Sequence, residues 1–233
     1  MIEIQLLESL NEAIIGCRVC PRLVDWREEV ARTKRKAYAD VEYWGRPVPG
    51  FGDPHARVMA VGLAPGAHGS NRTGRQFTGD ASGNFLFPAL FRAGFANRPE
   101  SSSRDDGLEL HDLYITAAGR CAPPGNKPLP AELNNCQTYL ERELELVRPQ
   151  VIVALGRIAF ERILRIFGTP ASSLAFGHGA AYPLSNQNWP ENTDRWLLAS
   201  YHPSQQNTLT GKLTVEMFDG IWQRARRLLK ENT

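Results

Sequence analysis

Four cysteines are the residues whose spacing most directly indicates chemistry. Cys17 and Cys20 form a C-x2-C pair, and Cys121 and Cys136 follow about a hundred residues later. In a cytosolic protein such thiols remain reduced, so four of them favour a metal over disulfides. The wide spacing of the second pair favours a [4Fe-4S] cluster over zinc, which usually takes two C-x2-C pairs. A third interpretation is that the four cysteines are buried thiols with no common ligand.

A second set of chemically capable residues follows the first of four short apolar runs, in the glycine-rich stretch 62–83. The backbone at Gly62 and Leu63 can approach a ligand closely and present N–H groups to it. Phe77 stands between polar residues, where its ring is well placed to stack on a planar ligand. Asp80 precedes a predicted helix, so it either caps that helix or holds a carboxylate at a ligand site.

Two further apolar runs also end in polar groups. The run that ends at Ala117 leads into a Pro- and Gly-rich loop with Asn126, which serves either turn formation or catalysis. The last run ends at His202, followed by Pro203 and a row of amides. A histidine at the end of a buried strand is either structural or a contact to substrate.

The elements that must position these residues alternate along the chain. Short β-branched runs predict strands buried on both faces, and the segments between them have helical patterning. The predicted strands are 57–63, 113–117, 151–156 and 196–201, and the predicted helices are 83–95, 130–147, 157–167 and 214–230. This order predicts an α/β fold, a three-layer α/β/α arrangement with a central four-stranded parallel sheet. Ligands of such sheets bind at the carboxyl ends of the strands.

Length and composition bound the class of protein. The chain of 233 residues, 42% of them hydrophobic, predicts a single domain over residues 1–233. The sequence shows neither a signal peptide nor a run long enough to cross a membrane, so we expect a soluble, cytoplasmic protein. A net charge of +2 does not by itself indicate nucleic-acid binding. The basic stretches 32–36 and 224–227 either contact phosphates or are solvated helix faces, and the polar segment 97–112 is expected to be a mobile surface insertion.

Taken together, the motifs resemble the iron–sulfur group of uracil-DNA glycosylases, and most of all family 5, the type B enzymes. The resemblance covers almost the whole chain. It rests on C-x2-C-P near the start, YWGRPVPGFGD at 43–53, GLAPGAHG at 62–69, GRQFTGDASG at 74–83, the later cysteine pair, and His202-Pro-Ser. The resemblance implies the uracil-DNA glycosylase-like fold and a [4Fe-4S] cluster on Cys17, Cys20, Cys121 and Cys136.

The implied activity is that of a monofunctional DNA glycosylase, which hydrolyses the N-glycosidic bond of uracil and leaves an abasic site. Type A enzymes carry Glu after the first motif glycine and Asn four residues before the third cysteine. This chain has Leu63 and Ala117 at those positions. At both positions an apolar side chain replaces a polar one that could distinguish uracil from other bases. The resemblance therefore also implies excision of hypoxanthine, xanthine and hydroxymethyluracil.

The predicted roles follow from the chemistry of a base flipped out of the duplex. His202 donates to the base oxygen, Phe77 stacks on the base, and Gly62, Leu63 and Ala117 form the pocket wall. Asp80 positions water or stabilises the positively charged sugar, with Asn126 as a second water-positioning group. Residues predicted to enter or contact the DNA are Gln205, Gln206, Asn207 and Leu209, and those predicted to hold phosphates are Ser70, Asn71, Arg72 and Lys212.

Two other functions fit the same motifs. One is a non-catalytic iron–sulfur module that binds nucleic acid without breaking a bond, and the other is a zinc-stapled hydrolase of small nucleotides. An abasic-site assay separates the first from a glycosylase, and metal analysis separates the second. The preferred reading is a monomer that acts on DNA containing uracil or other deaminated bases, with a structural cluster.

Overall fold

A parallel sheet forms the centre of the protein, whose computed structural model describes residues 2–184 and 195–231. Its four inner strands are β2 (Val58–Gly62), β3 (Leu113–Ala117), β4 (Val151–Leu155) and β6 (Arg195–Ser200). Each inner strand runs parallel to its inner neighbours, in the order β3-β2-β4-β6. All residues of β2, β3 and β4 are buried, as expected for strands covered on both faces. The predicted four-stranded parallel sheet is therefore confirmed.

Two antiparallel edge strands, which the sequence did not predict, extend this sheet to six strands. They are β1 (Phe51–Gly52), which pairs with β3, and β5 (Ala181–Leu184), which pairs with β6. Strand β1 has only two residues, and β5 contains Pro183 and is mostly only partly buried. Neither strand therefore shows the buried, β-branched pattern by which the inner strands were found.

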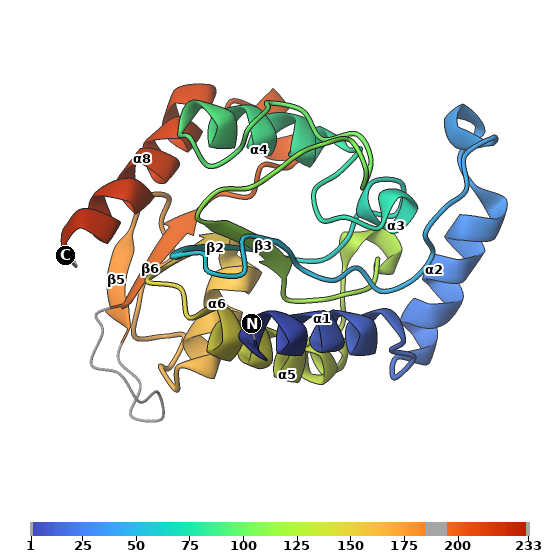
Figure 1. Ribbon diagram of the computed structural model, residues 1–233, viewed down its shortest axis with the longest axis horizontal. Helices are drawn as coiled ribbons and strands as arrows, with labels where there is room; N and C mark the ends of the chain where they lie inside the picture. Colours follow the sequence, from blue (N-terminus) through green and yellow to red (C-terminus); the bar gives the residue numbers. More distant parts are fainter. Residues whose placement is uncertain (1, 185–194, 232–233) are drawn as a thin grey trace.

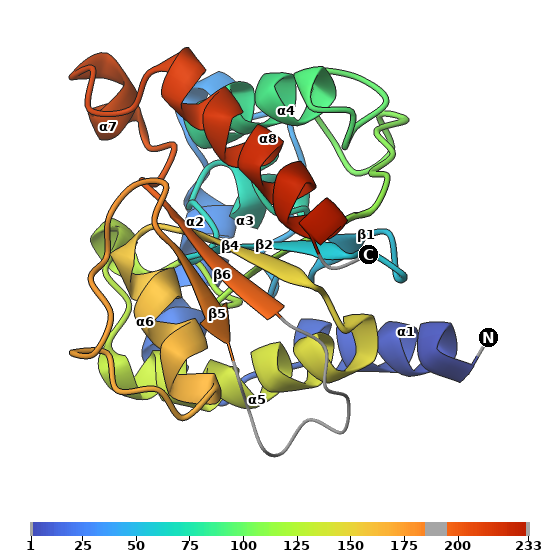
Figure 2. The same ribbon diagram turned by 90° about the vertical axis from the view of Figure 1, so that its left-hand side faces the viewer.

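Helices cover both faces of the sheet and complete the three layers (Figures 1 and 2). Helices α4 (Ala81–Arg92) and α8 (Val215–Glu231) lie on one face, and α1 (Ile2–Ile15), α5 (Pro130–Val147) and α6 (Arg157–Ile166) lie on the other. Successive strand residues alternate between the two cores, with Val58 and Ala60 on the α4 side and Met59 and Val61 on the α5 side. Within the described residues, none of the helices combines the length and apolar composition that a membrane span requires.

The remaining helices lie outside the two layers that cover the sheet, and several of them contribute residues near the carboxyl ends of the inner strands. They are α2 (Pro21–Thr33), the 3-10 helix η1 (Lys36–Tyr38), α3 (Ser70–Thr73), the 3-10 helix η2 (Pro124–Asn126) and α7 (Gln205–Leu209). Helix α7 occupies a stretch expected to be a loop, and it begins where the Ser204 hydroxyl accepts a hydrogen bond from the Asn207 N–H. Residues from these helices or from the segments next to them therefore surround the strand ends.

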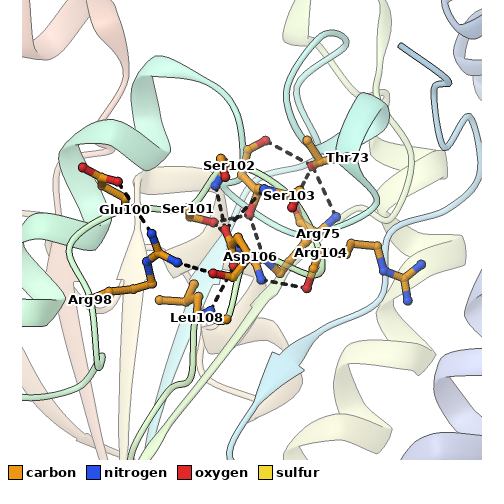
Figure 3. A network of polar contacts seen from close by, with 12 residues as sticks. Thr73, Arg75, Arg98, Glu100, Ser101, Ser102, Ser103, Arg104, Asp106 and Leu108 are labelled. Carbon is orange, nitrogen blue, oxygen red and sulfur yellow. Dashed lines mark hydrogen bonds and ion pairs between the residues drawn. The ribbon is translucent and has the colours of Figure 1, made fainter.

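The polar segment 97–112, expected to be mobile, is bonded to the chain that follows β2 (Figure 3). An Arg75 nitrogen lies 2.6 Å from a carboxylate oxygen of Asp106 and 2.7 Å from the Ser101 hydroxyl oxygen. The Arg75 Nε–H donates to the Thr78 hydroxyl at 3.0 Å. Asp106 also accepts hydrogen bonds from the backbone N–H groups of its own loop. These four side chains, Arg75, Thr78, Ser101 and Asp106, are called the Arg75 network below.

Candidate active site

A cavity of about 970 Å³ opens at the carboxyl ends of β2, β3 and β6. This volume is in the range of sites that enclose a small organic ligand. The cavity brings together all the residues predicted to bind a base or to catalyse, namely Gly62, Leu63, Phe77, Asp80, Ala117, Asn126 and His202. They come from parts of the sequence far apart from one another, so the parallel sheet is what assembles them.

Phe77 enters this cavity through an unusual backbone conformation. Its φ is +54°, a value that residues other than glycine rarely adopt. The ring lies so close to Gly62 that a Cβ added there would be 2.7 Å from the Phe77 Cζ atom. Only glycine therefore leaves room for the ring at this strand end. A strained, close-packed aromatic residue at a cavity is typical of functional sites.

His202 faces Phe77 at the end of β6. Their ring centroids are 6.0 Å apart and the ring planes are inclined by 31°. The His202 carbonyl accepts a hydrogen bond from the Asn207 amide at 2.9 Å, which fixes the turn that carries the imidazole. Burial lowers the pKa of His202 to about 4. The imidazole is therefore neutral at pH 7 and has one N–H to donate.

Asp80 caps a helix and lines the cavity at the same time. One carboxylate oxygen accepts a hydrogen bond from the Gly83 N–H at 3.0 Å, the first-turn contact of an N-cap. The other oxygen faces the glycine-rich loop, where a Cβ added to Gly69 would lie 2.1 Å from it. Burial raises the pKa of Asp80, although the N–H groups of Gly83 and Ser82 and the charge of Arg72 oppose the shift. The helix cap and the carboxylate at a ligand site, which the sequence offered as alternatives for Asp80, are thus compatible.

Among the lining residues that were not predicted, three have a guanidinium, phenol or imidazole side chain: Arg35, Tyr38 and His68. Arg35 and Tyr38 lie beyond the end of α2, and His68 belongs to the glycine-rich loop. Arg35 had been noted only within a basic stretch, Tyr38 has no neighbouring sequence pattern that indicates a ligand, and His68 lies in a motif that was noted for its glycines. Only the folded chain shows that the segment after α2 reaches the strand ends.

Comparison with known proteins agrees with this geometry. Residues 49–226 match the sequence model of the Uracil DNA glycosylase superfamily, which covers most of the chain and every lining residue named above except Arg35 and Tyr38. The chain belongs to the uracil DNA glycosylase superfamily.

Within this superfamily the chain is most similar to proteins named type 5. It is 56% identical to the Type-5 uracil-DNA glycosylase of Thermus thermophilus, over 95% of this chain and 97% of the relative. It is 51% identical to the Type-5 uracil-DNA glycosylase of Mycobacterium leprae, over 95% of each chain. A Type-4 uracil-DNA glycosylase of Archaeoglobus fulgidus is 31% identical over 85% of this chain and 81% of the relative. The resemblance to family 5 is therefore confirmed.

The four cysteines of this superfamily member are close in space. Burial raises the pKa of Cys121 to about 11, Arg27 opposes the rise, and Cys136 and Cys17 add to it. Burial is also the main cause of the raised pKa of Cys136, and the charges of Cys20 and Cys17 raise it further. An Arg27 N–H group lies 2.9 Å from the Cys121 Sγ atom. Cys121 and Cys136 are buried, and Cys17 and Cys20 are half-buried. The buried Arg27 guanidinium contacts the Cys121 sulfur and the Cys17 carbonyl.

A single metal ion does not fit this cysteine arrangement. Among the described residues, no group of three or more His, Cys, Asp or Glu side chains is close enough to surround one ion. Zinc holds each of its four sulfur ligands at about 2.3 Å, which requires a tighter group.

Some of the residues predicted to contact DNA are exposed, and others interact with neighbouring groups of the protein. Leu209 is 78% exposed on α7, and Gln205 and Gln206 are exposed beside it at the cavity. The Lys212 ammonium lies 5.0 Å from the centroid of the Tyr201 ring. Asn207 holds the His202 turn, as described above. Helix α7 therefore presents an apolar tip and flanking amides outward.

Around α3 the structure changes the prediction. Asn71 is fully buried, and its amide donates to the Arg27 carbonyl at 3.2 Å, so this side chain does not reach a phosphate. The Ser70 residue is also buried, although it lines the cavity. The Arg72 guanidinium donates to two backbone carbonyls of the glycine-rich region and stacks on Tyr38. Asn71 was thus wrongly predicted because its polarity serves an internal hydrogen bond.

Proposed function

We propose that this protein hydrolyses the N-glycosidic bond of uracil in DNA and leaves an abasic site. The observation that carries the proposal is one cavity that holds an aromatic ring, a neutral imidazole and a buried carboxylate, namely Phe77, His202 and Asp80. The type-5 and type-4 relatives, which are named as uracil-DNA glycosylases, support the same reaction.

The base binds at the inner end of the cavity after it has been flipped out of the helix. Phe77 stacks on the planar base, and the neutral His202 donates its N–H to a base oxygen. Cleavage leaves negative charge on the departing base, so a preorganised donor stabilises the transition state more than the ground state. A neutral imidazole suits this role, because its one N–H remains available over the whole physiological pH range.

Asp80 acts on the sugar side of the same bond. Cleavage builds positive charge on the sugar, which a buried carboxylate stabilises strongly because little water screens it. The carboxylate can also orient the attacking water, and Asn126, exposed at the cavity rim, is the second water-positioning group. The N-cap bond to Gly83 holds the Asp80 carboxylate in place without a change of rotamer during the reaction.

The apolar pocket wall predicts that the cavity accepts several different bases. Leu63 and Ala117 line the cavity with apolar side chains, so neither can form a hydrogen bond that rejects a base lacking the uracil edge. We infer that hypoxanthine, xanthine and hydroxymethyluracil are substrates as well. The test is a panel of oligonucleotides with one modified base each, incubated with excess enzyme and cleaved at abasic sites. Excision of uracil alone would overturn the broad selectivity, and binding without any abasic site would favour a non-catalytic module.

Helix α7 provides the contact with the vacated helix position. Leu209 is a large apolar side chain in water, and such wedges elsewhere enter between base pairs. Gln205 and Gln206 stand beside it at the cavity and can bond to the orphaned partner base. Lys212 contacts a backbone phosphate, so binding weakens as salt rises. A monomer suffices for these contacts.

The cysteines hold a [4Fe-4S] cluster in this proposal, with Cys17, Cys20, Cys121 and Cys136 as ligands. The electrostatic interactions among the four thiols support it, because they place the thiols near one another. The buried Arg27 beside Cys121 would offset the negative charge of that thiolate. The cluster supplies a rigid crosslink between the start of α2, the end of β3 and α5. Iron and acid-labile sulfide in equal amounts, with brown colour, support this assignment, and stoichiometric zinc in a colourless protein would refute it.

A further inference from the structure

Part of the cavity rim consists of cationic and aromatic side chains that the proposed reaction has not used. Arg35 and Tyr38 reach it from the segment after α2, and His68 reaches it from the loop after β2. Arg72, on α3, does not line the cavity itself, but its guanidinium stacks 4.1 Å from the centroid of the Tyr38 ring, which does. These four residues, Arg35, Tyr38, His68 and Arg72, are called the cationic rim.

Hydrogen bonds hold most of this rim in one arrangement. The Arg72 Nε–H donates to the His68 carbonyl at 2.8 Å, and a terminal nitrogen donates to the Gly79 carbonyl at 3.0 Å. The His68 Nδ1 atom lies 3.1 Å from the Tyr43 hydroxyl oxygen, and the two rings meet edge to face. Arg35 itself is exposed and is free to adjust to a ligand.

Within the described part of the chain, no ion pair neutralises the guanidinium charges of the rim. Among the residues that the structure describes, neither Arg35 nor Arg72 lies within ion-pair distance of a carboxylate, in contrast to Arg22, Arg57 and Arg92. Asp80 is the one carboxylate among the described residues that line the cavity. Burial lowers the pKa of His68, and the charges of Arg35 and Arg72 lower it further. The imidazole is therefore neutral, and both guanidinium charges are near it.

The order of groups around the cavity matches the order of groups in a nucleotide. Phe77 and His202 suit the base, and Asp80 suits the sugar. Arg72 is close enough to Asp80 to affect its pKa, and the charges of both Arg35 and Arg72 act on His68, which lines the same cavity. A phosphate attached to the sugar would therefore meet positive charge on this side of the cavity, with Arg35 as the lining guanidinium. Guanidinium groups bind phosphate oxygens with charge-assisted hydrogen bonds.

We propose that the cationic rim is a subsite for a backbone phosphodiester next to the flipped nucleotide, with Arg35 as the direct contact and Arg72 as a fixed positive charge behind Tyr38 and His68. This inference rests on the proposed glycosylase function and adds to it. Tyr38 and His68 position the rim, since they hold Arg72 by stacking and by a carbonyl contact. The segment after α2 thereby becomes part of the DNA-binding surface.

The test compares Arg35→Ala with Lys36→Ala, which removes the same charge from an exposed neighbour that does not line the cavity. Binding is measured on duplex DNA with one uracil, over a range of salt concentrations. We expect Arg35→Ala to bind roughly tenfold more weakly, with a salt slope smaller by about 0.9, the value for one lost phosphate contact. Lys36→Ala should bind like the wild type, and Arg35→Lys should lie between wild type and Arg35→Ala.

Neutral methylphosphonates identify the phosphate. One is placed on the 5′ side of the uridine and another on its 3′ side, in separate duplexes. A methylphosphonate at the contacted position should weaken binding by the wild type as much as the Arg35→Ala substitution weakens binding to normal DNA. The same methylphosphonate should not weaken binding by Arg35→Ala any further. The subsite would be overturned if Arg35→Ala bound more weakly than the wild type by the same factor on normal DNA and on both neutral duplexes, because Arg35 would then contact neither phosphate. Absence of uracil excision by the wild type would overturn the proposed function instead, so the two failures are distinct.

Discussion

The rings of Phe77 and His202 lie 6.0 Å apart between centroids, at the ends of strands that are not neighbours in sequence. Phe77 follows β2 and His202 follows β6, with β4 between these strands in the sheet. Gly156, at the end of β4, closes this gap, because a Cβ added there would lie 3.4 Å from the His202 Cβ. A stacking surface and a hydrogen-bond donor therefore meet at one place in the cavity.

Replacement of His202 by alanine should slow uracil excision strongly. Loss of one preorganised donor costs roughly 3 to 4 kcal/mol, on the order of a hundred- to a thousandfold in rate. The pKa of about 4 keeps the wild-type imidazole neutral above that pH. The His202 contribution should therefore stay constant between about pH 8 and pH 5 and change only near pH 4, where the imidazole gains a proton. His55→Ala, an exposed histidine outside the cavity, is the control in single-turnover assays.

Gly69→Ala should impair excision because of the Asp80 carboxylate. The added Cβ would lie 2.1 Å from one carboxylate oxygen, so the loop or the carboxylate must move. We expect a loss of at least about tenfold in rate and a decrease of about 1–3 kcal/mol in the free energy of unfolding. Gly220→Ala is the matched control, because its Cβ meets nothing within 4 Å. That change should stabilise α8 by about 0.5–1 kcal/mol. Normal excision by Gly69→Ala would show that the loop does not position Asp80.

The Arg75 network should stabilise both the fold and the active site. Arg75 and Asp106 side chains are 7% and 5% exposed, and breaking such a buried pair costs about 3–5 kcal/mol. Asp106→Leu should therefore lower the free energy of unfolding by that amount, measured by urea denaturation. Excision should slow too, because Phe77 lies between Arg75 and Thr78. The double variant Arg75→Met with Asp106→Leu should be less destabilised than Asp106→Leu alone; equal losses would contradict the pairing.

The same pair predicts a pH dependence of stability. Burial favours the neutral form of Asp106, but Arg75 and three backbone N–H groups outweigh it and hold the pKa well below its ordinary value. A carboxylate with a lowered pKa stabilises the fold fully above its unfolded pKa and progressively less below it. The difference in unfolding free energy between wild type and Asp106→Leu should therefore be the same at pH 7 and pH 5. It should shrink below about pH 4.

The sequence predicted the inner sheet and the inner end of the cavity well, because both depend on local patterns. Buried strands are β-branched runs, and an isolated Phe77 or a strand-end His202 stands out against its neighbours. Contacts between distant segments have no such signal. Arg75 and Asp106 are 31 positions apart, and Arg35 reaches the cavity only through the placement of α2. Asn71 was misjudged for a related reason, since its type does not reveal whether its partner is a phosphate or the Arg27 carbonyl.

Loss of one cysteine should remove the metal cluster and loosen α2. Cys121→Ser should lose iron, sulfide and visible absorption together, since a serine hydroxyl is a poor replacement for a thiolate ligand. Because Cys17 and Cys20 precede α2, the thermal unfolding temperature should also fall. Metal analysis and a thermal melt measure both effects. Retention of iron by Cys121→Ser would show that this thiol is not a ligand.

The most direct measurement is single-turnover excision of uracil from duplex DNA by the wild type and by Asp80→Asn. Asparagine keeps the N-cap bond from the Gly83 N–H, so the variant removes the charge and leaves the helix start intact. The account predicts abasic sites at uracil with the wild type, and a rate at least roughly a hundredfold lower for Asp80→Asn with an unchanged thermal melt. Near-normal excision by Asp80→Asn would show that Asp80 is only a helix cap, and no abasic sites with the wild type would contradict the glycosylase function itself.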